Sequence, residues 1–227
     1  MSISVDYYSD VLCVWSYATK IKIDEMKKNF AEQLNINYRY MPLFSDMHTM
    51  LNNNWADRGG LQGYNKMMHT LNEKFPYVEM HPEIGLKNLP HSSSACHLFL
   101  KAVSLLEERG EIHADDKQNT LLEQADWKIR LGYFKEAVDV SRQSEQMAIA
   151  EELELPVTKL EELLCNGEAM AALSSCTAGD KQKLLEGSPT FIFNEGRQKL
   201  YGNIGYHIIE ANIKALLAAP SDKPSWY

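Results

Sequence analysis

The sequence predicts an α/β fold that is interrupted by a large all-helical insertion. Near the amino end, residues 2–8 and 35–43 alternate apolar and polar side chains as strands do, with a helical stretch between them. A second pair of strand-like stretches and a last helix appear only near the carboxyl end. We therefore expect an α/β domain built from residues 1–45 and 187–227, and a helical insertion domain from residues 46–186.

The amino-terminal stretches form a strand, a helix and a second strand. Ile3, Val5 and Tyr7 face one side of the first strand, and the period changes to a helical one from Val14 to about residue 33. The second strand, residues 35–43, contains Pro near its end, where a missing N–H is tolerated. This spacing predicts a βαβ unit with a right-handed crossover.

The middle of the chain shows amphipathic helices separated by Pro and Gly. The predicted helices cover residues 60–75, 92–108, 119–134, 144–153, 157–165 and 168–185.

The α/β pattern then resumes with a hairpin and a closing helix. Residues 190–193 and 198–201 read as two short strands joined by a turn, and residues 202–205 open a helix that presents apolar side chains at helical spacing. Residues 219–227 read as an irregular tail.

Composition excludes several classes of function. The chain has 227 residues, 44% of them hydrophobic, and a net charge of −8, which fits an ordinary globular protein and disfavours nucleic-acid or membrane partners. The amino terminus lacks the pattern of a signal peptide, and no apolar run is long enough to span a bilayer. No nucleotide-binding glycine motif or zinc-ligand spacing is present, so we expect no metal and no nucleotide.

Four cysteines occur without the paired spacing of a disulfide framework, which agrees with a cytoplasmic location. We interpret Cys165 and Cys176 as core residues in helices, and Cys96-His97 as part of a packed helix face. Cys13 is different, because it lies where the first strand gives way to the first helix. Free N–H groups at a helix start favour a thiolate there.

Ser16 stands three residues after Cys13, where a redox dithiol has its second cysteine. The two-electron exchange of a Cys-x-x-Cys pair is therefore absent at this site. Ser16 is expected to donate a hydrogen bond to the sulfur and favour its charged form. The alternative is that Cys13 is simply a small apolar core residue.

Three segments resemble a known family: residues 9–17 (Ser-Asp-Val-Leu-Cys-Val-Trp-Ser-Tyr), residues 187–191 (Gly-Ser-Pro-Thr-Phe) and residues 196–203. Their order is similar to a thioredoxin fold with a helical insertion. It resembles most the DsbA-like family, which includes 2-hydroxychromene-2-carboxylate isomerases, kappa-class glutathione transferases and FrnE-like oxidoreductases. FrnE-like members carry Cys-Pro-Trp-Cys where this chain has Cys-Val-Trp-Ser, and the other two branches carry Ser at both ends of the motif.

The resemblance implies further site residues. Pro189 would follow a cis peptide bond that turns the backbone of Ser188 toward the sulfur, where a peptide or glutathione can pair with it. Asn203 is expected to cap the last helix, whose start would hold a substrate carboxylate. Trp15 either packs or shapes the site.

These expectations lead to a thiol-disulfide oxidoreductase that acts through Cys13 and uses glutathione as a cosubstrate. Its substrate would be a small thiol or a disulfide-containing peptide or protein. Two alternatives stay open: a glutathione-dependent isomerase or transferase in which the sulfur or Ser16 activates glutathione, and a non-catalytic peptide-binding module. The sequence is compatible with a homodimer, and it leaves open whether Cys96 acts as a resolving thiol.

Overall fold

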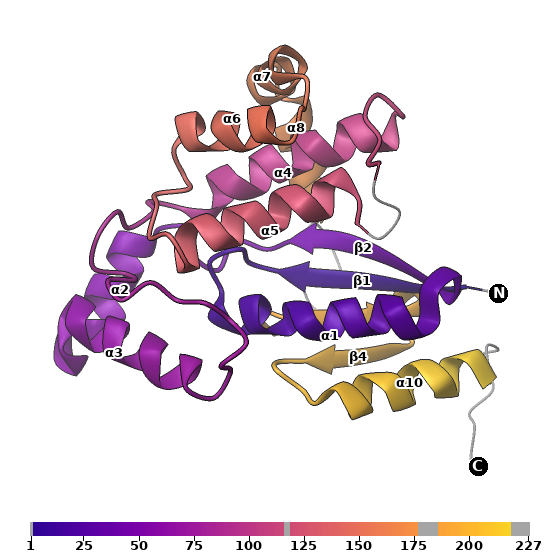
Figure 1. Cartoon of the computed structure of the whole chain (residues 1–227), viewed down its shortest axis with the longest axis horizontal. Helices are drawn as coiled ribbons and strands as arrows, with labels where there is room; N and C mark the ends of the chain where they lie inside the picture. The colour runs from indigo at the N-terminus through magenta and orange to yellow at the C-terminus, as the bar shows by residue number, and fades with distance from the viewer. Residues whose placement is uncertain (1, 116–118, 177–185, 219–227) are drawn as a thin grey trace.

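Four strands form one mixed sheet, in the order β2-β1-β3-β4. The structure is a computed structural model that describes residues 2–115, 119–176 and 186–218 (Figure 1). The strands are β1 (Ile3–Ser9), β2 (Leu34–Tyr40), β3 (Thr190–Phe193) and β4 (Gln198–Tyr201). All four were predicted, although β2 ends at Tyr40 instead of residue 43, because its partner β1 ends at Ser9, opposite Tyr40.

β1 is an inner strand, and its pairing brings the two ends of the chain together. It runs parallel to β2 and antiparallel to β3. The parallel pair is connected by α1 (Val14–Phe30) and a short 3-10 helix, Ala31–Gln33. Tyr8 lies opposite Thr190, so the turn that precedes β3 comes beside the end of β1. That end is where Cys13 begins α1.

One face of the sheet is covered by α1 and by α10 (Tyr206–Ala218), as Figure 1 shows. Alternate side chains of the strands meet the apolar sides of the two helices, as the period-2 pattern of β1 predicted. The buried cluster consists of Ile3, Val5, Tyr7, Ile23, Met26, Phe30, Phe191, Phe193, Ile209, Ile213 and Leu216.

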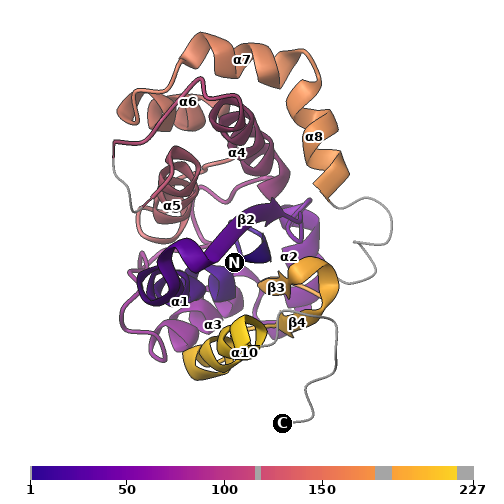
Figure 2. The same ribbon diagram turned by 90° about the vertical axis from the view of Figure 1, so that its right-hand side faces the viewer.

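Within the described part of the chain, the elements between β2 and β3 are all helical, as predicted. They are α2 (Met47–Trp55), a 3-10 helix (Ala56–Arg58), α3 (Gly60–Asn72), α4 (Ser93–Glu108), α5 (Leu121–Phe134), α6 (Gln143–Glu152), α7 (Val157–Cys165) and α8 (Glu168–Cys176). Figures 1 and 2 both place α4 to α8 beyond β2, away from α10.

Helix α2 was not predicted. Its sequence contains three consecutive asparagines, which are poor helix formers. The helix is instead fixed by its surroundings: the carboxylate of Asp46 accepts a hydrogen bond from Thr49 N at 3.0 Å, and Met47 and Leu51 are buried one turn apart. Tertiary packing therefore outweighs a weak local propensity here.

The turn between β1 and α1 is buried between the sheet and the helices that lie between β2 and β3 in the chain. Val11, Leu12 and Val14 belong to one buried cluster together with Tyr40 of β2 and with apolar side chains of α2 to α8. Cys13 therefore sits where the sheet meets the inserted helices. The division into a domain of residues 1–45 and 187–227 and one of residues 46–186 stays a prediction.

Two sequence predictions concern residues outside the described ranges: the end of the helix predicted up to residue 185, and the tail at residues 219–227. Among the helices that the structure describes, none combines the length and the apolar character needed to cross a bilayer.

Candidate active site

Cys13 occupies the N-cap position of α1, at the predicted junction of strand and helix. Its backbone is extended, its carbonyl accepts the first helical hydrogen bond from Tyr17 N at 3.0 Å, and its own N–H donates to Asp10 O at 3.1 Å. A tight turn from Asp10 to Cys13 thus delivers the sulfur directly from the end of β1.

The sulfur of Cys13 is a buried thiol, which corrects the prediction of a stabilised thiolate. The residue is 5% exposed, and its Sγ donates a hydrogen bond to Ser188 O at 3.4 Å. Burial raises the pKa of the Cys13 thiol, because a charged sulfur would lose its hydration. The N–H groups of Ser16 and Trp15 lower the pKa, as expected at a helix start, but burial has the larger effect.

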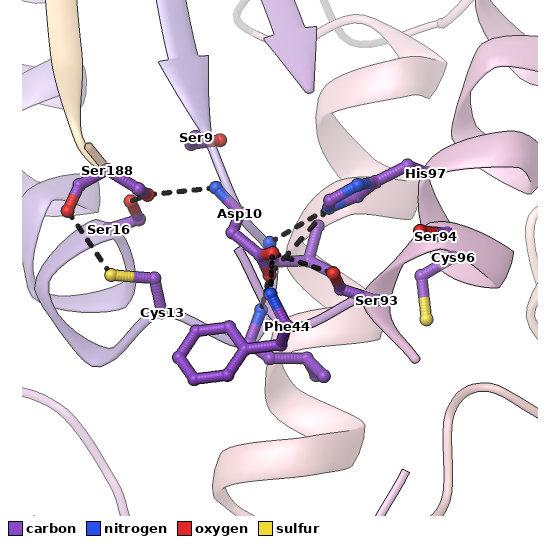
Figure 3. Close-up of polar contacts among 12 residues, drawn as sticks. Ser9, Asp10, Cys13, Ser16, Phe44, Ser93, Ser94, Cys96, His97 and Ser188 are labelled. Carbon is purple, nitrogen blue, oxygen red and sulfur yellow. Dashed lines mark hydrogen bonds and ion pairs between the residues drawn. The ribbon is translucent and has the colours of Figure 1, made fainter. Parts of the chain in front are cut away.

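Ser16 does not donate its hydroxyl to the sulfur as expected. Its Oγ lies 2.6 Å from Ser188 Oγ, and both side chains are buried. Ser188 Oγ also accepts a hydrogen bond from Asp10 N at 2.9 Å. The peptide bond between Ser188 and Pro189 is cis. The structure therefore brings Cys13, Ser16 and Ser188 together, with Ser188 at the centre of the contacts (Figure 3). Pro189 follows Ser188 directly in the chain.

Trp15 and Asn203 lie outside this group of contacts. Trp15 is 36% exposed on the first turn of α1, and its ring packs edge-on against Phe75, with 5.9 Å between the ring centroids. Asn203 does not cap α10, because Gly205 precedes that helix and accepts a hydrogen bond from Ile208 N. Its side chain accepts a hydrogen bond from Lys22 Nζ instead. The capping prediction for Asn203 is wrong.

Asp10 is a buried residue of the site that sequence reasoning missed. Its Oδ1 accepts from Leu12 N at 2.8 Å, and its Oδ2 accepts from Phe44 N at 3.1 Å and from Ser93 Oγ at 2.6 Å. The carboxylate thus ties the turn before α1 to the segment after β2 and to the start of α4 (Figure 3). An Asp directly after a strand, with an N–H donor two residues on, is a turn signal that could have revealed it.

His97 adds a neutral imidazole to this buried network. Its Nε2 accepts a hydrogen bond from Val11 N at 3.3 Å, so the ring hydrogen is assigned to Nδ1, which has no hydrogen-bond partner among the described residues. Burial lowers the pKa of His97. The ring stacks on Tyr40 with 5.1 Å between centroids. The prediction that His97 belongs to a packed helix face is confirmed.

Arg130 of α5 supports the same turn from the other side. It is 2% exposed and pairs with Asp126 through contacts of 2.7 and 3.2 Å. It also donates to Asp10 O at 3.2 Å and to Ser9 Oγ at 3.0 Å. Asp126 and Arg130 stand four residues apart on a helix, the spacing of an ion pair, but nothing in the sequence shows that this pair is buried.

The other cysteines are separate from the site, and all four are free. Cys96 is fully buried and donates to Val140 O at 3.2 Å, and burial raises its pKa far above the usual value. Cys176 is buried as predicted, but Cys165 is exposed, which corrects its interpretation as a core residue. It is the last residue of α7, past the buried Leu160 and Leu163.

A groove of about 1470 Å³ lies between α1, β2, α4 and α5. None of the site residues named above lines it, and its charged side chains include ion pairs such as Lys27 with Glu123 at 2.7 Å. Nowhere in the described ranges do three potential metal ligands gather.

Comparisons with known proteins agree on the fold. A family model described as the DSBA-like thioredoxin domain matches residues 4–214. The chain is 14% identical to a "probable DsbA oxidoreductase" from Streptomyces coelicolor, with a TM-score of 0.72 over 98% of this chain and 93% of that one. It is 14% identical to a 2-hydroxychromene-2-carboxylate isomerase, with a TM-score of 0.61 over 98% of this chain and 100% of that one.

The cytosolic disulfide reductase DsbM from Pseudomonas aeruginosa is 13% identical, with a TM-score of 0.62 over 93% of this chain and 99% of that one. No curated protein sequence matches the chain. The structural likeness confirms the predicted thioredoxin fold.

Proposed function

The chain belongs to the DSBA-like thioredoxin domain family, as its sequence resemblance predicted, and on this basis we propose that it is a thiol-disulfide oxidoreductase that acts through Cys13 alone. The observation that carries the proposal is the contact between Cys13 Sγ and Ser188 O at 3.4 Å. It supports a site in which a substrate backbone pairs with Ser188 while its sulfur meets Cys13.

The proposed reaction has two exchange steps. The Cys13 thiol loses its proton to solvent, and the thiolate attacks one sulfur of a disulfide R–S–S–R′. The Cys13–S–S–R bond forms while R′–S⁻ leaves and takes up a proton. The thiolate of a second thiol then attacks the sulfur of R. A disulfide forms between the second thiol and R, the bond from Cys13 to R breaks, and the Cys13 sulfur takes up a proton again.

Glutathione is the proposed second thiol, because Ser16 cannot resolve the mixed disulfide. The proposal is supported by a structure of the DsbM reductase that was solved with glutathione, with a TM-score of 0.61 to this chain. A cytoplasmic location is part of the proposal. It is supported by the four free cysteines and by the similarity to DsbM, which is described as a cytosolic disulfide reductase.

The burial of Cys13 favours a second candidate, a peptide-binding module without turnover. In that case the sulfur would keep its hydrogen bond to Ser188 O, and a bound peptide would pair with the Ser188 backbone only. The isomerase or transferase alternative differs from both, since it uses glutathione without a net change in its oxidation state.

Incubation with oxidised glutathione, followed by mass mapping of each cysteine, tests the proposal. A glutathione adduct on Cys13 that reduced glutathione removes is the expected result. Cys165→Ser serves as a matched control that eliminates adducts on the exposed thiol. No adduct on Cys13, with retention of a disulfide-free peptide, would select the binding module. Enzymatic conjugation of glutathione to an electrophile without a Cys13 adduct would select the transferase.

A further inference from the structure

Asp10 joins the turn that carries Cys13 to four other parts of the chain. Its side chain receives hydrogen bonds from within the turn, from the segment after β2 and from the start of α4. Its backbone N–H donates to Ser188 Oγ, and its carbonyl accepts from Cys13 N and from Arg130 Nη1. A single residue thus holds both the strand end before Cys13 and the Ser188 side chain in place.

The hydrogen bonds to Asp10 are those of an ionised carboxylate. All three donors point at its two oxygens, and an ionised carboxylate is an acceptor only. His97 Nε2 lies 3.8 Å from Oδ1, but this nitrogen accepts from Val11 N, so His97 supplies no positive charge. Arg130 contacts the carbonyl of Asp10 while its charge is paired with Asp126. N–H and O–H dipoles therefore stabilise a buried negative charge in the turn.

We infer that Asp10 is a positioning residue for Cys13, whose carboxylate fixes the turn and whose negative charge holds the buried sulfur as a thiol. Burial is the main cause of the raised pKa of Cys13, and the Asp10 charge acts in the same direction. The inference rests on the proposed function only in taking Cys13 as the reactive group.

The other titratable and charged groups around this turn have fixed states near neutral pH. Burial raises the pKa of Tyr7 and of Tyr64 to about 12, so both hydroxyls stay neutral, and His97 is neutral as well. The remaining charged groups, Asp126 and Arg130 of α5, form a pair. Removal of the Asp10 charge therefore changes the electrostatic environment of the sulfur without breaking the Asp126–Arg130 pair.

The test is the pH dependence of iodoacetamide alkylation at Cys13 in Asp10→Asn, measured by mass mapping. Asn keeps the size of the side chain and an acceptor for Leu12 N but removes the charge. The half-point, which is the pH at which Cys13 is alkylated at half of its maximal rate, should move down by roughly one pH unit. The reason is that a neighbouring negative charge disfavours the thiolate, and Asn removes that charge. At pH 8 the alkylation should be several-fold faster than in the wild type.

Asp139→Asn is a matched control. Asp139 is a buried acid that also accepts from an N–H two residues on, Ser141 N at 3.1 Å, but it lies in the turn between α5 and α6. Ser93→Ala removes one hydrogen bond to Asp10 and leaves its charge. Both variants should keep the wild-type half-point.

An unchanged half-point in folded Asp10→Asn overturns the inference, as does an equal shift in either control. If Asp10→Asn does not fold, Asp10→Ser takes its place, because Ser also removes the charge and keeps a short acceptor for Leu12 N: a lower half-point than in the wild type supports the inference, and an unchanged one overturns it. A wild-type half-point at or below roughly 8.5, the unperturbed value, overturns it as well. Alkylation needs no disulfide and no glutathione. A failed glutathione-adduct experiment would therefore count against the proposed function and leave this test intact.

Discussion

Cys13 Sγ donates a hydrogen bond to the backbone carbonyl of Ser188, although the two residues are 175 positions apart in the chain. The contact exists because β1 and β3 pair side by side, with Cys13 following one strand and Ser188 preceding the other. The contact requires a protonated sulfur, since a thiolate has no hydrogen to donate, and burial raises the pKa of the Cys13 thiol. The resting protein therefore shields its candidate nucleophile.

Cys165, and not Cys13, should be the first cysteine to react with iodoacetamide at pH 7. Cys165 is exposed, whereas Cys13 is 5% exposed and its pKa is raised by burial. Mass mapping after short reaction times gives the order directly. Cys96 serves as an internal reference for a fully buried thiol. Faster labelling of Cys13 than of Cys165 would contradict the buried-thiol description.

Ser16→Cys should increase the reduction of insulin disulfides by dithiothreitol above the wild-type rate. The new thiol would stand one helical turn from Cys13, where it can attack the mixed disulfide and release the substrate. Ser104→Cys on α4 is a control that adds a cysteine away from Cys13. Equal rates in the wild type and Ser16→Cys would show that resolution does not limit turnover.

Arg130→Met should destabilise the protein by about 3–5 kcal/mol, because Asp126 would remain buried without its partner. The double variant with Asp126→Leu should recover part of this loss. Urea unfolding measures both free energies. Lys128→Met, which breaks the more exposed pair with Glu152, should cost no more than about 1 kcal/mol. A similar loss in both single variants would refute the importance of burial at Arg130.

Stability should fall as the pH rises above about 8.5, where an unfolded cysteine begins to ionise. Burial raises the folded pKa values of Cys96 and Cys13, so the folded state keeps protons that the unfolded state releases. The contribution of these two thiols to stability is fully present at pH values below the pKa of an unfolded cysteine. It is lost progressively as the pH rises from that value toward the pKa of the thiol in the folded protein.

Cys96→Ser should make this fall shallower by about 1.4 kcal/mol per pH unit, since one buried thiol no longer titrates. The measurement is urea unfolding at several pH values between 8 and 10. Cys165→Ser, at an exposed position, controls for the Cys-to-Ser substitution itself. An unchanged slope in folded Cys96→Ser would contradict the raised pKa of that thiol.

The fold was accessible from sequence because its signals are local. Period-2 and period-3.6 patterns identified all four strands and most helices, and the motifs around Cys13 and Pro189 indicated the thioredoxin arrangement. Helix α2 was not predicted, because its asparagines carry no helical signal. Its formation is explained by the packing of Met47 and Leu51 and by the Asp46 cap.

The site was predicted only in part, because its decisive contacts link distant residues. Cys13, Ser16 and Ser188 do meet, yet the sequence does not show that the hydroxyl of Ser16 contacts Ser188 in place of the sulfur. Nor does the sequence reveal how deeply the sulfur is buried, which decides the direction of its pKa shift. Asp10, His97 and Arg130 come from the turn after β1, from α4 and from α5, and no local spacing reveals that these residues converge.

The late position of β3 in the chain has a consequence for biosynthesis. On the ribosome, β1 and β2 emerge first, but the strand that pairs with the other edge of β1 follows more than a hundred residues later. At translation rates of about 5–20 residues per second, the nascent chain exposes this strand edge for on the order of ten seconds. An unpaired inner strand is prone to wrong pairing during that interval. Cotranslational packing of α1 against β1 would cover one face of the strand, but its edge stays open until β3 leaves the exit tunnel.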